Sequence, residues 1–357
     1  MVHERAKAKR GTGSAAPTGA AGGGDLSVIV PLFNEASGLP ALHKRLLAFA
    51  RRLGETRGFK VEIVYVDDGS GDDTLAVARS LTADGCDLQI VSLSRNFGKE
   101  SALAAGLDHA RFGALLFMDG DGQHSPELAE RLVQLWRDEG YDVVYTAKAH
   151  RAGEPATRRI AARFFYRLLN WGARHPIPED ASDFRLLSPR AAAALRRLPE
   201  RNRFFKGLSS WIGFRQIRVP YEPALRSHGR TSWNLSTLLG LSIEGLTAFS
   251  TAPLRVASLL GLALSAGALL FGIWILFETL YFGRDVAGYP SIIVGIMVIG
   301  GVQLLMIGVM GEYVAKILSE LKARPVYFVA EHELREAVGT GKSGSATTAD
   351  EPREAAE

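Results

Sequence analysis

Residues 114–126 read ALLFMDGDGQHSP. Its apolar beginning ends in two carboxylates, Asp119 and Asp121, which a single glycine separates. A short apolar run of this kind predicts a buried strand, and Ser125 followed by Pro126 predicts the first turn of a helix. We therefore expect a strand, an acidic turn and a helix in succession.

Other short apolar runs, rich in β-branched residues, have the same character. In the segments that separate the first three of these runs, leucines recur at helical spacing, for example over 39–49 and 75–81. Strands that alternate with helices predict an α/β domain with a mostly parallel sheet, whose ligands bind at the carboxyl ends of the strands. The further predicted strands are 26–33, 59–68, 88–94 and 141–148.

The residues at the predicted strand ends exclude several enzyme classes. The first strand is followed by VPLFNEASG and not by a Gly-x-Gly-x-x-Gly turn, so no backbone cradle for a dinucleotide is present there. No Gly-x-Ser-x-Gly elbow of a serine hydrolase and no zinc-ligand spacing occurs. Acids stand at the strand ends instead: Glu35, Asp67, Asp68, Asp119 and Asp121.

An Asp-x-Asp pair at a strand end suits a hard divalent cation that also takes oxygen from a phosphate. We therefore predict Mg²⁺ or Mn²⁺ together with a diphosphate at Asp119 and Asp121. Gly120 and Gly122 would let the backbone turn sharply and approach a bulky ligand.

Two uncharged apolar runs, 256–277 and 291–311, are each long enough to cross a hydrocarbon core of about 30 Å. We predict transmembrane helices over 253–283 and 289–314; a pair of buried core helices is the alternative. Basic residues precede the first run and follow the second, which predicts a cytoplasmic catalytic domain (26–225), C-terminal segment (315–336) and termini. The lone Cys86 excludes an internal disulfide and fits a reducing compartment.

The remaining segments are basic, amphipathic or of low complexity. Residues 1–25 and 337–357 are predicted to be disordered tails. The helical patterns at 158–174 and 226–252 predict helices lying in a membrane interface, although ordinary helices packed on the sheet are the alternative. Arg158 and Arg159 belong to a basic cluster that we interpret as the binding surface for an acceptor phosphate, or else a solvated helix face. A net charge of +4 is too small to suggest nucleic acid as a partner.

Five ordered motifs carry a family resemblance: VIVPLFNE, VDDGSGDDT, SRNFGKESALAAGL, MDGDGQHSP and DFRLLSPR. The chain resembles the family-2 inverting glycosyltransferases with a GT-A fold over about residues 26–330. Within that family it is similar to the polyisoprenyl-phosphate hexosyltransferases, such as dolichyl-phosphate mannose synthase and the bacterial GtrB-type glucosyltransferases. The resemblance implies a GT-A nucleotide-sugar-binding domain followed by interfacial and transmembrane helices.

The resemblance also implies site residues on the donor side. Pro31, Phe33 and Glu35 would surround the base and ribose of the nucleotide, and Asp68 would contact the base. Asp119 would lie near the ribose, the donor sugar or the metal.

Metal and acceptor residues follow from the same resemblance. Asp121 and Gln123 would ligate the metal, Asp183 would be the catalytic carboxylate, and Arg226 would meet phosphate. Ser232 stands where the family often has a lysine, which puts any role of that lysine in doubt. No Gln-x-x-Arg-Trp element is present, which favours a single transfer over processive synthesis.

The implied activity is transfer of a hexose to a polyprenyl phosphate, such as undecaprenyl phosphate, with inversion. Glucose from UDP-glucose is the favoured donor sugar. The alternatives are mannose transfer from GDP-mannose and a catalytically silent membrane scaffold on the same fold. We expect the protein in the cell inner membrane, with the lipid bilayer as a partner and a homo-oligomer such as a tetramer as an option. Because the acceptor phosphate is already ionised at neutral pH, Asp183 is expected to act chiefly by orienting a phosphate-binding cation such as Arg185.

Overall fold

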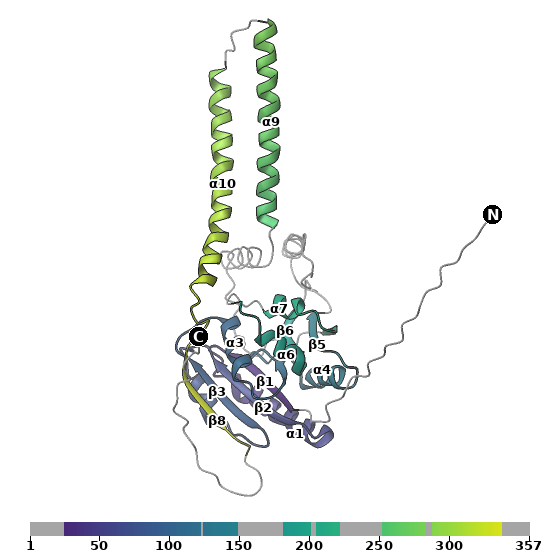
Figure 1. Ribbon diagram of the computed structural model, residues 1–357. Coiled ribbons are helices and arrows are strands. Elements are labelled where there is room, and N and C mark those ends of the chain that lie inside the picture. Colours follow the sequence, from purple (N-terminus) through teal and green to yellow (C-terminus); the bar gives the residue numbers. More distant parts are fainter. Residues whose placement is uncertain are drawn as a thin grey trace, which may run out of the picture.

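A computed structural model of the protein describes residues 25–122, 124–148, 181–200, 205–221, 252–282 and 288–337. Within these residues an α/β domain carries one mixed sheet, and two long helices extend from it (Figure 1). The predicted disordered tails and interfacial helices, together with Gln123, Arg158, Arg159 and Arg226, lie outside the described residues.

The N-terminal half of the sheet is parallel, as predicted. Its strands lie in the order β4-β1-β2-β3, and every neighbouring pair in this series is parallel. They closely match the predicted apolar runs because parallel strands covered on both faces are apolar along most of their length. Their bounds are β1 Asp25–Leu32, β2 Lys60–Asp67, β3 Asp87–Leu93 and β4 Ala114–Phe117.

The strands beyond β4 do not lie in the order in which they occur along the chain. β6 (Ala181–Leu187) lies between β4 and β5 (Val143–Lys148) and is antiparallel to both. β7 (Gln216–Tyr221) pairs in parallel with β5 at the edge. The strand predicted at 141–148 therefore forms, but β6 separates it from the parallel series. This insertion brings residue 183 beside the end of β4.

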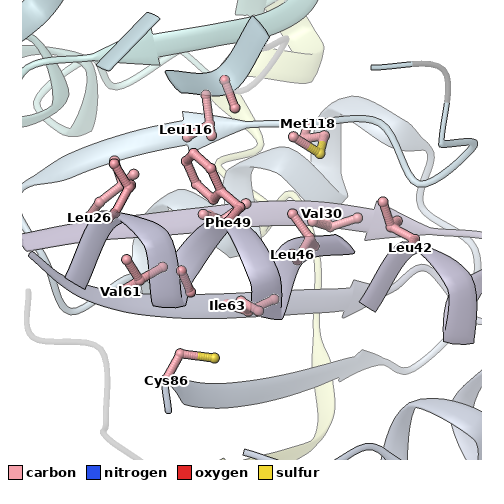
Figure 2. Close-up of a cluster of buried hydrophobic side chains, with 14 of the residues drawn as sticks. Leu26, Val30, Leu42, Leu46, Phe49, Val61, Ile63, Cys86, Leu116 and Met118 are labelled. Carbon is pink, nitrogen blue, oxygen red and sulfur yellow. The ribbon is translucent and has the colours of Figure 1, made fainter. Parts of the chain in front are cut away.

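Helices cover both faces of the sheet. One apolar cluster joins one face of β1 to α1, α2 and α4, and Figure 2 shows α1 side chains such as Leu42, Leu46 and Phe49 against β1 and β4. A second cluster joins the other face of β1 to α3, α6 and α7. Cys86 is buried in the first cluster, where it forms no disulfide. The helix bounds are α1 Leu39–Arg57, α2 Thr74–Ser80, α3 Lys99–His109, α4 Pro126–Arg137, α6 Pro189–Arg196 and α7 Phe205–Trp211.

The two long helices are α9 (Ala252–Phe282) and α10 (Tyr289–Leu321). At 1.5 Å per residue each is more than about 45 Å long, which exceeds a hydrocarbon core of about 30 Å. Their apolar segments Val256–Ile275 and Val298–Leu321 are almost entirely exposed, so they are not the core helices of the α/β domain. By length and composition both helices are able to cross a membrane. α10 continues seven residues beyond the predicted end at 314.

After α10 the chain returns to the sheet. β8 (Val329–Arg335) pairs antiparallel with β3 at the edge, a strand that the sequence pattern does not predict. Arg79 of α2 binds the Glu333 carboxylate at 2.6 Å, and Arg335 donates a hydrogen bond to the Leu81 carbonyl at 2.9 Å. The segment predicted as 315–336 thus contains a strand of the domain, and this strand connects the C-terminal end of α10 to the sheet.

Candidate active site

The acidic turn after β4 is tight, as its glycines predict. A Cβ atom on Gly120 would lie 3.0 Å from the Pro31 carbonyl oxygen and 3.1 Å from Leu32 Cδ2, so this turn lies directly against the end of β1. Gly122 has a φ of +70°, which glycine adopts without strain. The turn therefore sets Asp119 and Asp121 next to the end of the neighbouring strand.

Groups on α1 and α4 fix this turn. Arg45 of α1 donates hydrogen bonds to the Gly122 carbonyl at 2.9 Å and the His124 carbonyl at 2.8 Å. Ser125 accepts a hydrogen bond from the Leu128 amide at 3.2 Å, and Pro126 occupies the first turn of α4, as predicted. The carboxylates consequently stand on a rigid support.

A lysine that the sequence reasoning missed joins the predicted acids. The Lys99 Nζ atom, at the start of α3, lies 2.5 Å from Asp119 Oδ1 and 2.6 Å from Asp183 Oδ2. Lys206 of α7 lies 3.4 Å from the other oxygen of Asp183. The structure thus brings Asp119 and Asp183 together through one ammonium group and places a second ammonium beside them.

The ion pairs set the protonation state of these acids. Burial by itself would raise the pKa of Asp183, but Lys206 and Lys99 outweigh it and hold that pKa below its usual range. Burial likewise opposes ionisation of Asp119, and Lys99 and His124 lower its pKa overall. Burial would lower the pKa of Lys99, yet the charges of Asp183 and Asp119 raise it. Both acids are therefore carboxylates at neutral pH, and Lys99 is an ammonium.

Asp68 holds the loop that leads into Lys99. Its two carboxylate oxygens accept hydrogen bonds from the Phe97 amide at 2.8 Å and the Gly98 amide at 2.9 Å. Gly69 has a φ of +65°, and a Cβ there would lie 2.5 Å from the Arg95 carbonyl carbon. Burial raises the pKa of Asp68, while the two amides oppose that rise. The predicted base contact of Asp68 stays a prediction, and the structure adds a second task for the same carboxylate.

Two further charged side chains, Glu100 and Arg185, lie near the lysines and Asp183. Glu100 accepts a hydrogen bond from the Phe205 amide at 3.0 Å, and burial followed by the charge of Asp183 raises its pKa to about 7. The Arg185 side chain is buried and donates to the Ser182 carbonyl at 2.7 Å, the Phe205 carbonyl at 3.2 Å and the Ser209 hydroxyl. Arg185 therefore braces β6 against α7 instead of facing a ligand.

His124 is a structural neighbour of Asp119. Its ring stacks on Phe184 with centroids 4.4 Å apart and an interplanar angle of 10°. Its Nε2 atom lies 3.8 Å from Asp119 Oδ2, and its Nδ1 atom is buried without a hydrogen-bond partner in the described part of the chain. His124 therefore supports the position of the Asp119 carboxylate through its packing.

Three predicted nucleotide-side residues lie at the end of β1 or directly after it: Pro31, Phe33 and Glu35. Phe33 is 48% exposed although it is a large apolar side chain, so its ring is accessible to a flat ligand. The Glu35 amide donates to Thr74 Oγ1 at 2.8 Å, which ties this loop to the start of α2. Pro31 is partly buried and lies under Gly120. The loops after β1, β2 and β4 thus meet at one end of the sheet.

The donor set decides whether the predicted metal fits. Among the described residues no three His, Cys, Asp or Glu side chains converge on one point, and Gln123 is not among those residues. Asp119 and Asp121 of the acidic turn provide two carboxylates, and one oxygen of Asp119 also binds Lys99. That set fits Mg²⁺, which proteins usually bind through one or two carboxylates plus substrate phosphates and water.

The sheet is open and mixed, and its carboxylates lie at the carboxyl ends of parallel strands, where α/β domains bind their ligands. This arrangement agrees with the GT-A nucleotide-sugar domain that the sequence resemblance implies. Residues 27–196 match the family described as glycosyl transferase family 2. The chain is 40% identical to the bactoprenol glucosyl transferase of Shigella phage SfII over 304 residues, 85% of this chain and 97% of that one. It is 38% identical to a prophage bactoprenol glucosyl transferase homolog of Escherichia coli K12, over 85% of this chain and 98% of that one.

A solved structure of glucosyl-3-phosphoglycerate synthase from Mycobacterium tuberculosis, in complex with Mn²⁺, UDP-glucose and phosphoglyceric acid, is also similar. It is 20% identical, covers 63% of this chain and 78% of that one, and has a TM-score of 0.42. The long and nearly complete matches to the relatives are decisive. This chain belongs to glycosyl transferase family 2 and is a glycosyltransferase.

Proposed function

We propose that this protein transfers glucose from UDP-glucose to undecaprenyl phosphate, with inversion at the anomeric carbon, on the cytoplasmic face of the inner membrane. The names of the relatives supply the sugar and the kind of lipid. The family supplies the reaction type.

One structural observation carries the proposal. The chain with the strand-end carboxylates also contains two exposed apolar helices long enough to cross a membrane, and after α10 it returns to the sheet through β8. A polyprenyl phosphate keeps its tail in lipid while its phosphate must reach a water-soluble sugar nucleotide. A soluble type of active site tied to two spans meets both requirements.

The chemistry follows from the acceptor. A phosphate oxygen of the lipid forms a bond to the anomeric carbon while the bond from that carbon to the nucleoside diphosphate breaks, giving a lipid-linked sugar and UDP. Asp119 and Asp121 would hold Mg²⁺ or Mn²⁺, which when bound offsets the negative charge of the leaving diphosphate. Phe33, Glu35, Pro31 and Asp68 would contact the nucleotide, as the family resemblance implies.

Asp183 is a weak base in this site. Its two lysine partners hold its pKa below the usual range, and a carboxylate of lower pKa takes up protons less readily. The acceptor has little need of a base, because the second pKa of a phosphate monoester is about 6 and the group is largely a dianion at neutral pH. We therefore assign Asp183 to positioning and electrostatics rather than to proton transfer.

The test is a product assay in membranes that contain the protein. A panel of labelled nucleotide sugars is incubated with undecaprenyl phosphate, and the lipid extract is analysed for label against membranes that lack the protein. We expect labelled lipid from UDP-glucose. Its release as a sugar 1-phosphate of inverted configuration would establish the stereochemistry.

The alternatives give other results in the same assay. Label transferred from GDP-mannose but not from UDP-glucose would replace glucose by mannose in the proposal. A folded, membrane-inserted protein that labels no lipid from any nucleotide sugar would overturn the proposed acceptor. Metal-dependent thermal stabilisation by UDP would still distinguish a sugar-nucleotide enzyme with another acceptor from a silent scaffold.

A further inference from the structure

Two lysines from different helices meet at one carboxylate. Lys99 begins α3 and binds Asp183 Oδ2 at 2.6 Å, whereas Lys206 lies on α7 and approaches Asp183 Oδ1 at 3.4 Å. Lys99 also binds Asp119 Oδ1 at 2.5 Å, so two ammonium groups and two carboxylates meet at this point of the site. Both ammonium groups come from helices outside the sheet, whereas the carboxylates belong to the sheet and to the turn after β4.

The two lysine side chains are more exposed to solvent than the carboxylate that they share. The Asp183 side chain is 14% exposed, whereas Lys206 is 25% and Lys99 44% exposed. An ammonium group has three N–H donors, and Lys99 gives two of them to Asp119 and Asp183. Within the described residues, Asp183 is the salt-bridge partner of Lys206. Both lysines thus retain donors for a ligand, while a buried carboxylate fixes where those donors lie.

We propose that Lys99 and Lys206 together receive the phosphate of the acceptor lipid, with Asp183 as the positioning residue that holds both ammonium groups. A phosphate monoester dianion has three terminal oxygens, so it can accept hydrogen bonds from both lysines at once. This inference rests on the proposed function and deepens it by locating the acceptor site.

The place of α7 favours the acceptor over the donor diphosphate. α7 lies on the side of the domain from which α9 and α10 extend (Figure 1). Trp211 at the end of α7 is 55% exposed, and exposed tryptophans are typical of membrane–water interfaces. The loops predicted to contact the nucleotide follow β1 and β2 instead. A lipid phosphate entering from the membrane side would therefore reach Lys206 first.

Other cations near the site are already engaged. Arg185 is buried and donates to backbone carbonyls and to Ser209. The Arg95 guanidinium lies 4.2 Å from the centroid of the Phe97 ring. Among the described residues at this end of the sheet, the two lysines are the cations best placed to bind a phosphate.

The test compares Lys206→Met with wild type in steady-state transfer of labelled glucose to undecaprenyl phosphate. Lys206 is the better target because Lys99 also binds Asp119. We expect the KM for undecaprenyl phosphate to rise about tenfold to a hundredfold, which is the loss of one charge-assisted hydrogen bond, while the KM for UDP-glucose stays within about twofold. Lys206→Arg should recover part of the loss, and Asp183→Asn should raise the same KM because both ammonium groups lose their anchor.

Lys60→Met is the matched control, because Lys60 is exposed at the opposite end of β2 and loses the same charge. Direct binding of UDP gives a second measurement that must not change in Lys206→Met. If Lys206→Met does not fold, Lys206→Gln provides the same comparison. An acceptor KM equal to wild type, or equal weakening of both substrates, would overturn the inference. Absence of transfer by wild type would instead overturn the proposed function.

Discussion

Replacing Asp68 by asparagine tests whether this carboxylate holds the loop before α3. In the wild type its two oxygens accept the Phe97 and Gly98 amides at 2.8 and 2.9 Å. An asparagine side chain has one acceptor oxygen, so one buried amide would face an NH₂ group. Loss of the bond to the charged acceptor, with the amide left unsatisfied, costs about 1.5–3 kcal/mol, partly offset because no charge has to be buried.

We therefore expect Asp68→Asn to lower the free energy of unfolding by about 2 kcal/mol, which for a domain of this size lowers the melting temperature by about 4–8 °C. The local effect is measured by hydrogen exchange of the detergent-solubilised protein. The Phe97 and Gly98 amides should exchange up to about thirtyfold faster, because opening of the loop becomes easier by a similar free energy. Transfer activity should also fall, since this loop places Lys99.

Asp67→Asn is the control for this prediction. Asp67 is the preceding residue and is equally buried, but its contacts are longer: 3.3 Å to the Ser70 amide and 3.5 Å to the Ser92 hydroxyl. It should change exchange at Phe97 and Gly98 little. If Asp68→Asn leaves both the melting temperature and the exchange of these amides unchanged while UDP-glucose affinity falls, Asp68 is a nucleotide ligand and does not hold the loop before α3.

Three further substitutions test other parts of the site. Gly120→Ala should reduce kcat at least tenfold with little loss of stability, because its Cβ would lie 3.0 Å from the Pro31 carbonyl oxygen and shift the acidic turn. In the control Gly54→Ala the Cβ would lie 3.6 Å from its nearest neighbour, so kcat should not fall. Glu100→Gln should remove a pH dependence of stability: the pKa is raised from 4.5 to about 7, so up to about 3 kcal/mol is present below pH 4.5 and is lost as the pH rises through 7. Parallel unfolding curves for Glu100→Gln and wild type across this range would contradict that prediction. Asp121→Asn should abolish transfer and leave the melting temperature unchanged, whereas near-normal turnover at saturating Mg²⁺ or Mn²⁺ would show that Asp121 does not hold the metal.

The parallel half of the sheet could be predicted from the sequence because strands such as β1 and β2 are apolar on both faces. β8 could not, because its sequence VAEHELR is largely polar and exposed, and its partner β3 lies far earlier in the chain. β6 was also missed: it carries the motif around Asp183, but nothing local shows that it enters between β4 and β5.

The site residues likewise divide into those that the sequence predicts and those that it does not. Asp119 and Asp121 could be identified because they directly follow an apolar run and flank a glycine. Lys99 and Lys206 were missed because a lysine near the start of a helix is usually solvated, and only tertiary packing brings these two to Asp183. The quoted motif SRNFGKESALAAGL contained Lys99, but its spacing gave no reason to select that residue.

The return of the chain from α10 to β8 has a consequence for how the protein is made. β3 is synthesised early, but its outer edge has no strand partner until residues 329–335 leave the ribosome, after both long helices. An unpaired strand edge is a template for wrong pairing between chains. The catalytic sheet is therefore completed only after both long helices have been synthesised, and a nascent chain halted between these helices would still expose the outer edge of β3.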